Sequence, residues 1–357
     1  MPSVRAALAL LLATPACAWS APDAAHALAA SEAAPLPTWT LPVGLMFPTL
    51  TLNTASLSVE QTAAVVEKAN ALGITSVDFH LGNERKGVTR ALATLGRDAL
   101  FLVTKLDKPP ADMTDPQEAA QLARTTLTEE LSEIGSVDVL LLKDSATCEV
   151  MQAQWAVLEH WLDRGLAKAL GTYNYCPSAL DCLLATAKTP PALNFLMRHP
   201  GMGPDTSGDI AYSESKGVRV VTYGTLGEPI ALPKLLNSTV LSRIGASHDP
   251  PRTPEEVALR WNTQAGYAVT SRPTADYNLT SSFCFDDCHT GLSAMRATYD
   301  WALTPSEVAA IDALIIATPP QPATYYASSG CPTFDPETAG QLHSACLEDQ
   351  ASSRWCN

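Results

Sequence analysis

The chain has 357 residues, of which 46% are hydrophobic and 17% are charged, so it contains enough apolar sequence for a large buried core. Its formal charge of −14 and the absence of any cluster of Lys and Arg argue against a nucleic-acid partner and against electrostatic attachment to a membrane. No apolar run reaches the roughly 20 residues that a transmembrane helix needs, and no membrane span is expected.

Residues 1–18 have the pattern of a secretory signal peptide: one positive charge, a short apolar run, and small residues at Ala16 and Ala18 that predict cleavage before Trp19. We therefore expect a secreted protein or one in the endomembrane lumen. The aromatic residue at the cleavage point leaves a second hypothesis open, import into a complex plastid. The Ala- and Pro-rich residues 19–40 are expected to form a flexible lead-in, and they lack the Arg that is abundant in transit segments.

From residue 41 onward, strand-like apolar runs alternate with amphipathic stretches. Helices are expected over about 116–134, 150–165 and 178–187, and three more are expected to begin at Ser58, to end at Lys216 and to begin at Thr253. Strands are expected at 76–79, 100–104, 137–142, 168–172, 192–195, 218–222 and 267–271. Capping-box spacing marks two of the helix starts. The continuous apolar run at 137–142 is typical of a strand that is buried on both faces.

This alternation defines the fold class, α/β. About eight strands separated by helices over roughly 280 residues predict a (β/α)8 TIM barrel over residues 41–318. A doubly wound sheet is disfavoured, because no Gly-x-Gly-x-x-Gly motif follows the first strand.

The cysteines and sequons agree with export. Eight cysteines follow the signal peptide, and an even number in an exported chain predicts disulfides. They are Cys148, Cys176, Cys182, Cys284, Cys288, Cys331, Cys346 and Cys356. Residues 319–357 are rich in Pro, Ser and Cys and are expected to form a C-terminal tail, with at least one bridge to Cys284, Cys288 or Cys148 of the barrel. No metal site is expected, and the sequons at Asn237 and Asn278 predict glycans.

A series of motifs in this chain resembles the aldo-keto reductases. The resemblance begins at residues 72–78, which are followed by Gly82-Asn83-Glu84. It continues through Thr104-Lys105, 136–142, 165–171, Asn174, 191–194, His199-Pro200, 216–218, 223–227 and 253–261. It implies a barrel that holds NADP(H) at its C-terminal mouth and reduces a small-molecule carbonyl substrate.

The resemblance also implies a catalytic arrangement. In the family, a Tyr donates a proton, a Lys paired with an Asp lowers the pKa of that Tyr, and a His orients the substrate carbonyl. Asp78 and Lys105 match the Asp and the Lys, and both stand at strand ends, where barrel enzymes place their chemistry. The alternative for these two residues is a buried structural ion pair.

The acid and the orienting His are both missing. Leu81 stands at the position of the acid, and a leucine cannot donate a proton. His80 is a candidate substitute because imidazole titrates near neutral pH, and the alternative is an ordinary packing residue. Lys143 stands at the position of the His and could polarise a carbonyl, or could form an ordinary surface pair with Asp144.

The cofactor contacts implied by the resemblance are half retained. Asn174 matches the residue that binds the nicotinamide carboxamide, Tyr223 matches the aromatic residue that stacks on the nicotinamide, and Leu226 lies in the loop that follows. Arg272 supplies one cation for a 2′-phosphate, whereas Phe195 replaces the second carboxamide partner, a Gln.

The sequence therefore predicts an NADP-type aldo-keto reductase homologue, a pseudoenzyme by the standard mechanism, with weak or altered carbonyl or alcohol redox activity. A second hypothesis is a non-catalytic secreted binding or regulatory module with an unknown protein partner. A third is lysine-based carbonyl chemistry at Lys143 or Lys105.

Overall fold

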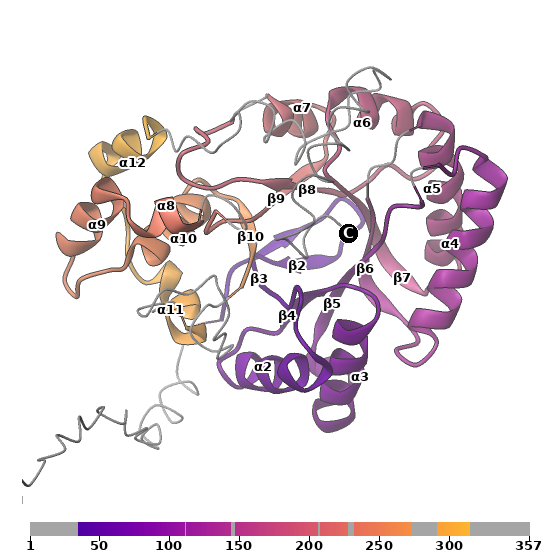
Figure 1. The fold of residues 1–357 in the computed structure, drawn as a ribbon, viewed down its shortest axis with the longest axis horizontal. Coiled ribbons are helices and arrows are strands. Elements are labelled where there is room, and N and C mark those ends of the chain that lie inside the picture. Colours follow the sequence, from indigo (N-terminus) through magenta and orange to yellow (C-terminus); the bar gives the residue numbers. More distant parts are fainter. Residues whose placement is uncertain are drawn as a thin grey trace, which may run out of the picture. The chain divides into compact units, whose positions relative to one another are not determined.

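The computed structural model describes residues 35–110, 112–143, 147–205, 208–227, 232–272 and 291–314. The barrel strands are β3 (Leu50–Asn53), β4 (Ser76–Phe79), β5 (Phe101–Leu106), β6 (Val137–Lys143), β7 (Ala167–Tyr173), β8 (Leu193–Met197), β9 (Arg219–Tyr223) and β10 (Ala268–Ser271). They pair in parallel and close in the order β10-β3-β4-β5-β6-β7-β8-β9 (Figure 1). The predicted (β/α)8 barrel is confirmed.

Helices connect the strands and lie on the outside of the barrel (Figure 1). They are α2 (Val59–Ala71), α3 (Asn83–Leu95), α4 (Pro116–Leu131), α5 (Cys148–Asp163), α6 (Pro177–Leu184), α7 (Asp209–Ser215), α8 (Leu232–Leu236), α9 (Thr239–Ala246), α10 (Pro254–Gln264), α11 (Leu292–Arg296) and α12 (Pro305–Asp312), with single 3-10 turns at Arg97–Ala99 and Ala297–Tyr299. Among the described residues, no helix combines the length and the apolar character needed to cross a bilayer.

Local chemistry explains where the predicted helices begin and end. Ser58 and Gln61 form a reciprocal capping box before α2, and Thr253 and Glu256 do the same before α10. Gly217 follows α7 with a φ of +78°, a left-handed conformation that glycine adopts without strain. The two predicted capping boxes and the predicted glycine at the end of α7 are therefore confirmed.

The core lies on both sides of the barrel wall. On β6, Leu140 and Leu142 pack outward against the helices, whereas Val139 and Leu141 point into the barrel. All four side chains have no exposed area, so the prediction of a strand buried on both faces is confirmed.

An antiparallel hairpin precedes the barrel and corrects one prediction. Strands β1 (Thr38–Thr40) and β2 (Met46–Pro48) pair with Trp39 opposite Phe47. The ring of Phe47 is fully buried and meets Phe101, the first residue of β5, edge to face at 5.5 Å between centroids. The hairpin therefore covers the N-terminal end of the barrel. The flexible lead-in predicted to reach residue 40 is too long, because Trp39 alternates with threonines and forms a strand.

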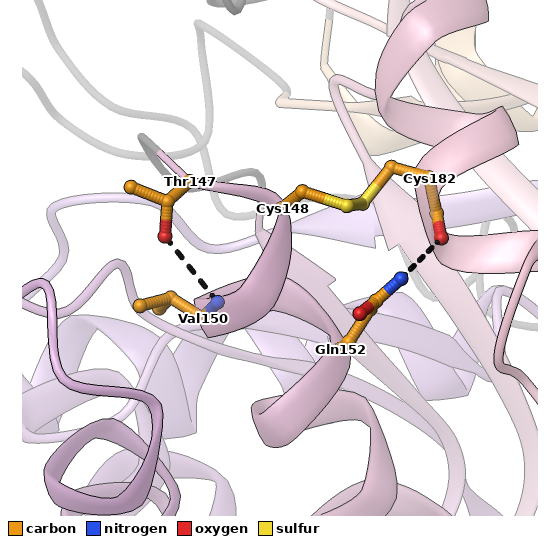
Figure 2. Close-up of a disulfide and its surroundings, with 5 residues drawn as sticks. All are labelled: Thr147, Cys148, Val150, Gln152 and Cys182. Atoms are coloured by element: carbon orange, nitrogen blue, oxygen red, sulfur yellow. Dashed lines mark hydrogen bonds between the residues drawn. A yellow bond between two sulfur atoms is a disulfide. The ribbon is translucent and has the colours of Figure 1, made fainter.

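A disulfide joins two neighbouring helices (Figure 2). Cys148, the first residue of α5, is bonded to Cys182 in α6, and the side-chain amide of Gln152 donates a hydrogen bond to the backbone oxygen of Cys182 at 2.8 Å. Cys176, which caps α6, is also disulfide-bonded. The prediction of disulfides is confirmed for these cysteines, but Cys148 is wrong as an acceptor for the tail, because it already has a partner.

Several predictions concern residues that lie outside the described ranges. They are the signal peptide at 1–18, most of the lead-in at 19–34, Asp144, Asn278, Cys284, Cys288 and the tail at 319–357. The other sequon residue, Asn237, is exposed between α8 and α9. Within the described ranges, no group of three or more His, Cys, Asp and Glu side chains is placed to hold a metal ion.

Candidate active site

The candidate residues gather at one end of the barrel. Each stands at the C-terminal end of a strand or directly after one: Asp78 (β4), His80 (after β4), Lys105 (β5), Lys143 (β6), Asn174 (after β7), Tyr223 (β9), Leu226 (after β9) and Arg272 (after β10). Because the strands are parallel, these ends meet at the same mouth, where barrel enzymes carry their active sites.

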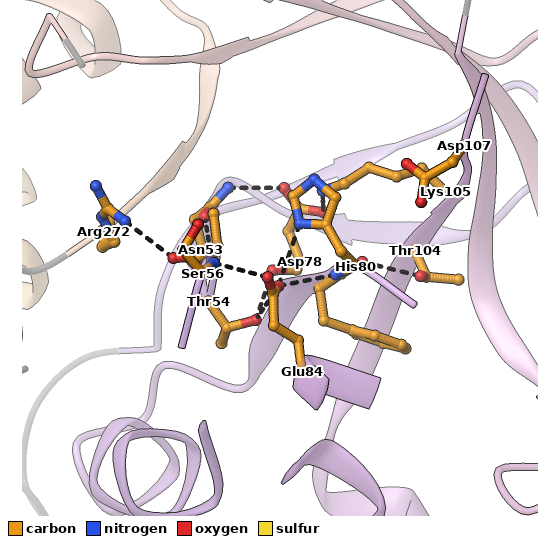
Figure 3. A network of polar contacts seen from close by, with 12 residues as sticks. Asn53, Thr54, Ser56, Asp78, His80, Glu84, Thr104, Lys105, Asp107 and Arg272 are labelled. Carbon is orange, nitrogen blue, oxygen red and sulfur yellow. Dashed lines mark hydrogen bonds and ion pairs between the residues drawn. The ribbon is translucent and has the colours of Figure 1, made fainter. Parts of the chain in front are cut away.

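A buried ion pair lies at the centre of this mouth. The Nζ atom of Lys105 is 2.6 Å from Oδ1 of Asp78, and both side chains have no exposed area. The second oxygen of Asp78 accepts a hydrogen bond from Asn53 in β3 at 3.1 Å (Figure 3). It accepts another from Thr270 in β10, also at 3.1 Å. Four strands thus converge on one carboxylate. The pairing of Asp78 with Lys105 is present, and its role in catalysis stays a prediction.

A second carboxylate, Glu84, organises the loop around His80. It is the second residue of α3, and it accepts hydrogen bonds from the backbone N–H of Ser56 at 2.7 Å and from the hydroxyl of Thr54 at 3.0 Å. Its Oε2 also accepts from the backbone N–H of His80 at 2.9 Å and lies 3.2 Å from Nδ1 of the imidazole (Figure 3). Sequence reasoning missed this role, although Glu84 lies within a quoted motif.

The surroundings of His80 favour the neutral imidazole. Burial and the positive charge of Lys105 lower the pKa of His80 despite the opposing effect of Glu84. Burial alone would raise the pKa of Glu84, but the side-chain and backbone hydrogen bonds of His80 and the positive charge of Lys105 outweigh it and hold that pKa low. The hydrogen bond between Nδ1 of His80 and Glu84 assigns the proton to Nδ1 and leaves Nε2 as an acceptor. His80 is therefore better suited to accept a proton than to donate one.

Lys143 forms an ion pair with Asp107, and Asp144, the partner expected from the sequence, lies outside the described residues. Its ammonium lies 2.5 Å from Oδ1 of Asp107, the residue that follows β5. Burial would raise the pKa of Asp107, but the charge and hydrogen bond of Lys143 outweigh it and lower that pKa. Both Lys143 and Lys105 are thus held against carboxylates, and this arrangement does not favour a free amine nucleophile.

An aromatic stack fills the other side of the mouth. The rings of Tyr173 and Tyr223 are stacked with centroids 4.7 Å apart, and Phe195 stacks on Tyr173 at 6.1 Å. The ammonium of Lys105 lies 5.5 Å from the centroid of Tyr173. Sequence reasoning missed Tyr173, the last residue of β7, because it belongs to no motif that was used.

Asn174 is fixed in an unusual conformation beside this stack. Its φ of +65° is left-handed, which costs energy in most residues but is tolerated by asparagine. Its side-chain oxygen accepts a hydrogen bond from the hydroxyl of Tyr223 at 2.8 Å. The two residues that were expected to hold a nicotinamide therefore bind each other.

The described residues do not fit a nicotinamide cofactor in this arrangement. The ring of Tyr223 stacks on Tyr173, the side-chain oxygen of Asn174 is engaged by Tyr223, and Phe195 offers no polar group. Leu226 is fully buried. Arg272, expected at a 2′-phosphate, is only 8% exposed as a residue, and its guanidinium donates to the backbone oxygen of Ala55 at 2.9 Å.

Comparisons with known proteins agree with the geometry of the barrel. The aldo-keto reductase Rv2971 of Mycobacterium tuberculosis is 30% identical over 259 residues, which cover 71% of this chain and 86% of that protein. The NAD(P)H-dependent D-xylose reductase xyl1 of Hypocrea jecorina is 28% identical over 239 residues, 54% of this chain and 70% of its own length.

Solved structures share the fold at lower identity. MGS-M4, an aldo-keto reductase enzyme from a Medee basin deep-sea metagenome library, superposes with a TM-score of 0.66 at 17% identity and covers 84% of this chain and 99% of its own. A sequence model of the aldo/keto reductase family matches residues 44–314, which include all eight barrel strands. This chain belongs to the aldo/keto reductase family.

Proposed function

We propose that this chain is a catalytically attenuated aldo-keto reductase, in which carbonyl or alcohol redox activity is weak or altered. The observation that carries the proposal is the buried pair of Asp78 and Lys105, which is retained although Leu81 and Lys143 replace the family's proton donor and its substrate-orienting His. Leu81 cannot donate a proton, and the ammonium of Lys143 is held by Asp107.

The remaining side chains support an altered role rather than a standard one. The ammonium of Lys105 is fully buried, so it acts on its neighbours by charge and not by direct contact with a substrate. A neutral His80 with Nε2 as acceptor favours removal of a proton from an alcohol over protonation of a carbonyl oxygen. Family members take hydride chemistry from a nicotinamide cofactor, but the contacts described above give this chain no ready place for one.

One observation favours a second function, a non-catalytic binding or regulatory module on the same barrel. The residues that match the family's nicotinamide contacts are engaged with each other through the Tyr223–Asn174 hydrogen bond and the Tyr173–Tyr223 stack. A barrel that is closed in this way could still present its mouth to a small carbonyl compound or to a protein partner.

Turnover measurements test the first function. We expect reduction of a panel of small aldehydes and aldoses by NADPH to be undetectable or at least about 10²-fold slower than in relatives, because general-acid catalysis contributes roughly 10²–10⁴-fold and the donor is absent. NADPH consumption and product formation should both be followed. Turnover at the rates of relatives would contradict the proposal.

In that event His80 should be tested first as the substitute acid. His80→Ala should abolish the turnover, whereas the control His160→Ala changes an exposed residue of α5 and should leave it intact. Saturable NADPH binding without turnover keeps the attenuated-enzyme proposal, and no NADPH binding up to millimolar concentration favours the module.

A further inference from the structure

Tyr173 is the one aromatic side chain of the stack that the family resemblance assigns no role. It ends β7, whose neighbour β8 carries Phe195, and Tyr223 ends β9, the strand on the other side of β8. Its ring is half-buried and packs between 22° and 27° from parallel with both neighbours. A ring held on two aromatic neighbours and close to the ammonium of Lys105 has a defined position at the barrel mouth.

The position of this ring matters because of what a nicotinamide needs. A planar pyridine ring with a carboxamide requires an open aromatic face and polar partners for its amide. The face of Tyr223 that meets Tyr173 is covered at a centroid distance of 4.7 Å, which is the separation of a direct stack. The hydroxyl of the same Tyr223 donates a hydrogen bond to the side-chain oxygen of Asn174. The aromatic face and the amide oxygen that a nicotinamide would contact are therefore both engaged within the protein.

We propose that the side chain of Tyr173 occupies the nicotinamide position and sets whether a dinucleotide can enter the barrel. The inference rests on the proposed function, since it takes the family's cofactor as the ligand. The ring must leave Tyr223 before a nicotinamide can stack there, so the measured affinity is the intrinsic affinity multiplied by the fraction of molecules that are open.

Affinity measurements on two variants test this inference. Tyr173→Ser removes the ring, and Tyr173→Phe keeps the ring but removes the hydroxyl. NADPH binding is measured by nicotinamide fluorescence, and 2′,5′-ADP, which lacks the nicotinamide, is measured by calorimetry. We expect Tyr173→Ser to lower the Kd for NADPH at least about tenfold, as follows if no more than about a tenth of the wild-type chain is open. Tyr173→Phe should bind NADPH like the wild type, and the Kd for 2′,5′-ADP should be the same in all three proteins.

Two outcomes would overturn the inference: an unchanged Kd for NADPH in Tyr173→Ser, or an equal gain for NADPH and 2′,5′-ADP, which would indicate a general change in the site. Tyr173→Ala replaces the serine variant if the latter does not fold. Turnover is assayed separately. A serine variant that binds NADPH tightly and reduces aldehydes at the rates of relatives upholds the role of Tyr173 and contradicts the attenuated function, because the missing acid would then not limit turnover.

Discussion

At the scale of single residues, the buried pair is the feature with the largest expected effect. The ammonium of Lys105 and the carboxylate of Asp78 have no exposed area, so removing either partner leaves a charge without its counterion in a low-dielectric environment. We expect Lys105→Met to lower the free energy of unfolding by about 3–5 kcal/mol in urea denaturation. Lys143→Met is the matched control, because Asp107 is 54% exposed and such a pair contributes about 0–1 kcal/mol.

The double variant sharpens this test. Replacing Asp78 by Asn together with Lys105→Met removes both charges, and Asn53 and Thr270 can still donate to the amide oxygen. We expect the double variant to be more stable than Lys105→Met alone. Equal losses for Lys105→Met and Lys143→Met would show that the buried pair has no special energetic role.

A buried histidine outside the candidate site gives the barrel a pH-dependent stability. His199 follows β8 and is fully buried, its Nδ1 donates to the backbone oxygen of Pro200, and burial lowers its pKa to about 4. The unfolded chain therefore takes up the proton more readily between pH 6.5 and 4, and stability falls as the pH falls through that window. We expect His199→Asn to remove about 2 kcal/mol of the stability difference between pH 7 and pH 5.

Urea unfolding of both proteins at the two pH values measures this effect. The comparison with the variant is needed because Asp209, whose pKa is raised to about 6 by burial and by Asp205, has a dependence of opposite sign. If the wild type and His199→Asn lose the same free energy between pH 7 and pH 5, the imidazole is protonated equally in both states and the prediction is wrong.

Part of the site could be foreseen from the sequence, and part could not. The resemblance to the family implied that Asp78 and Lys105 form a pair, and their places at the ends of parallel strands, which meet at one mouth, agree with it. Tyr173 and Glu84 gave no such signal. The stack joins β7 to β9, 50 positions apart in the chain, and Glu84 is tied to Thr54 and Ser56 by loop geometry that no spacing rule describes.

At the scale of secondary-structure elements, the disulfide between α5 and α6 is the clearest test. It closes a sequence separation of 34 residues, for which chain entropy alone predicts about 4 kcal/mol. We expect Cys148→Ser/Cys182→Ser to lower the free energy of unfolding by about 2–4 kcal/mol in urea.

A variant in the same turn provides the control. Thr147 accepts a hydrogen bond from the backbone N–H of Val150 at the start of α5, and Thr147→Ala should cost about 1 kcal/mol (Figure 2). A double serine variant that loses no more than Thr147→Ala would show that packing of α5 against α6, and not the covalent bond, holds this part of the wall.

Elements with strong local signals were predicted better than those without. Caps at Ser58 and Thr253 and the apolar run of β6 are properties of a few adjacent residues, so they are visible in the sequence. The hairpin of β1 and β2 has strands of three residues each, and its stability comes from Phe47 packing against the barrel. Composition over 19–40 could not reveal it.

At the scale of the whole molecule, we propose that the chain is exported through the secretory route, with a complex plastid as the alternative. The bond between Cys148 and Cys182 supports an oxidising compartment. We expect the mature protein from its native source to begin at Trp19, which terminal sequencing or intact mass would establish. An uncleaved N-terminus on the mature protein would contradict the signal-peptide assignment.

The hairpin beneath the barrel limits where any protease can trim this protein. The backbone oxygen of Pro37 accepts hydrogen bonds from both the N–H and the hydroxyl of Thr49, and the ring of Trp39 lies 4.6 Å from the guanidinium of Arg219. A cut near Leu41, as a plastid peptidase reading residues 19–40 as leader would make, would remove these contacts and open the floor of the barrel. We therefore expect maturation by either route to spare the residues from Pro37 onward, and a mature chain that begins near Leu41 without loss of stability would contradict this.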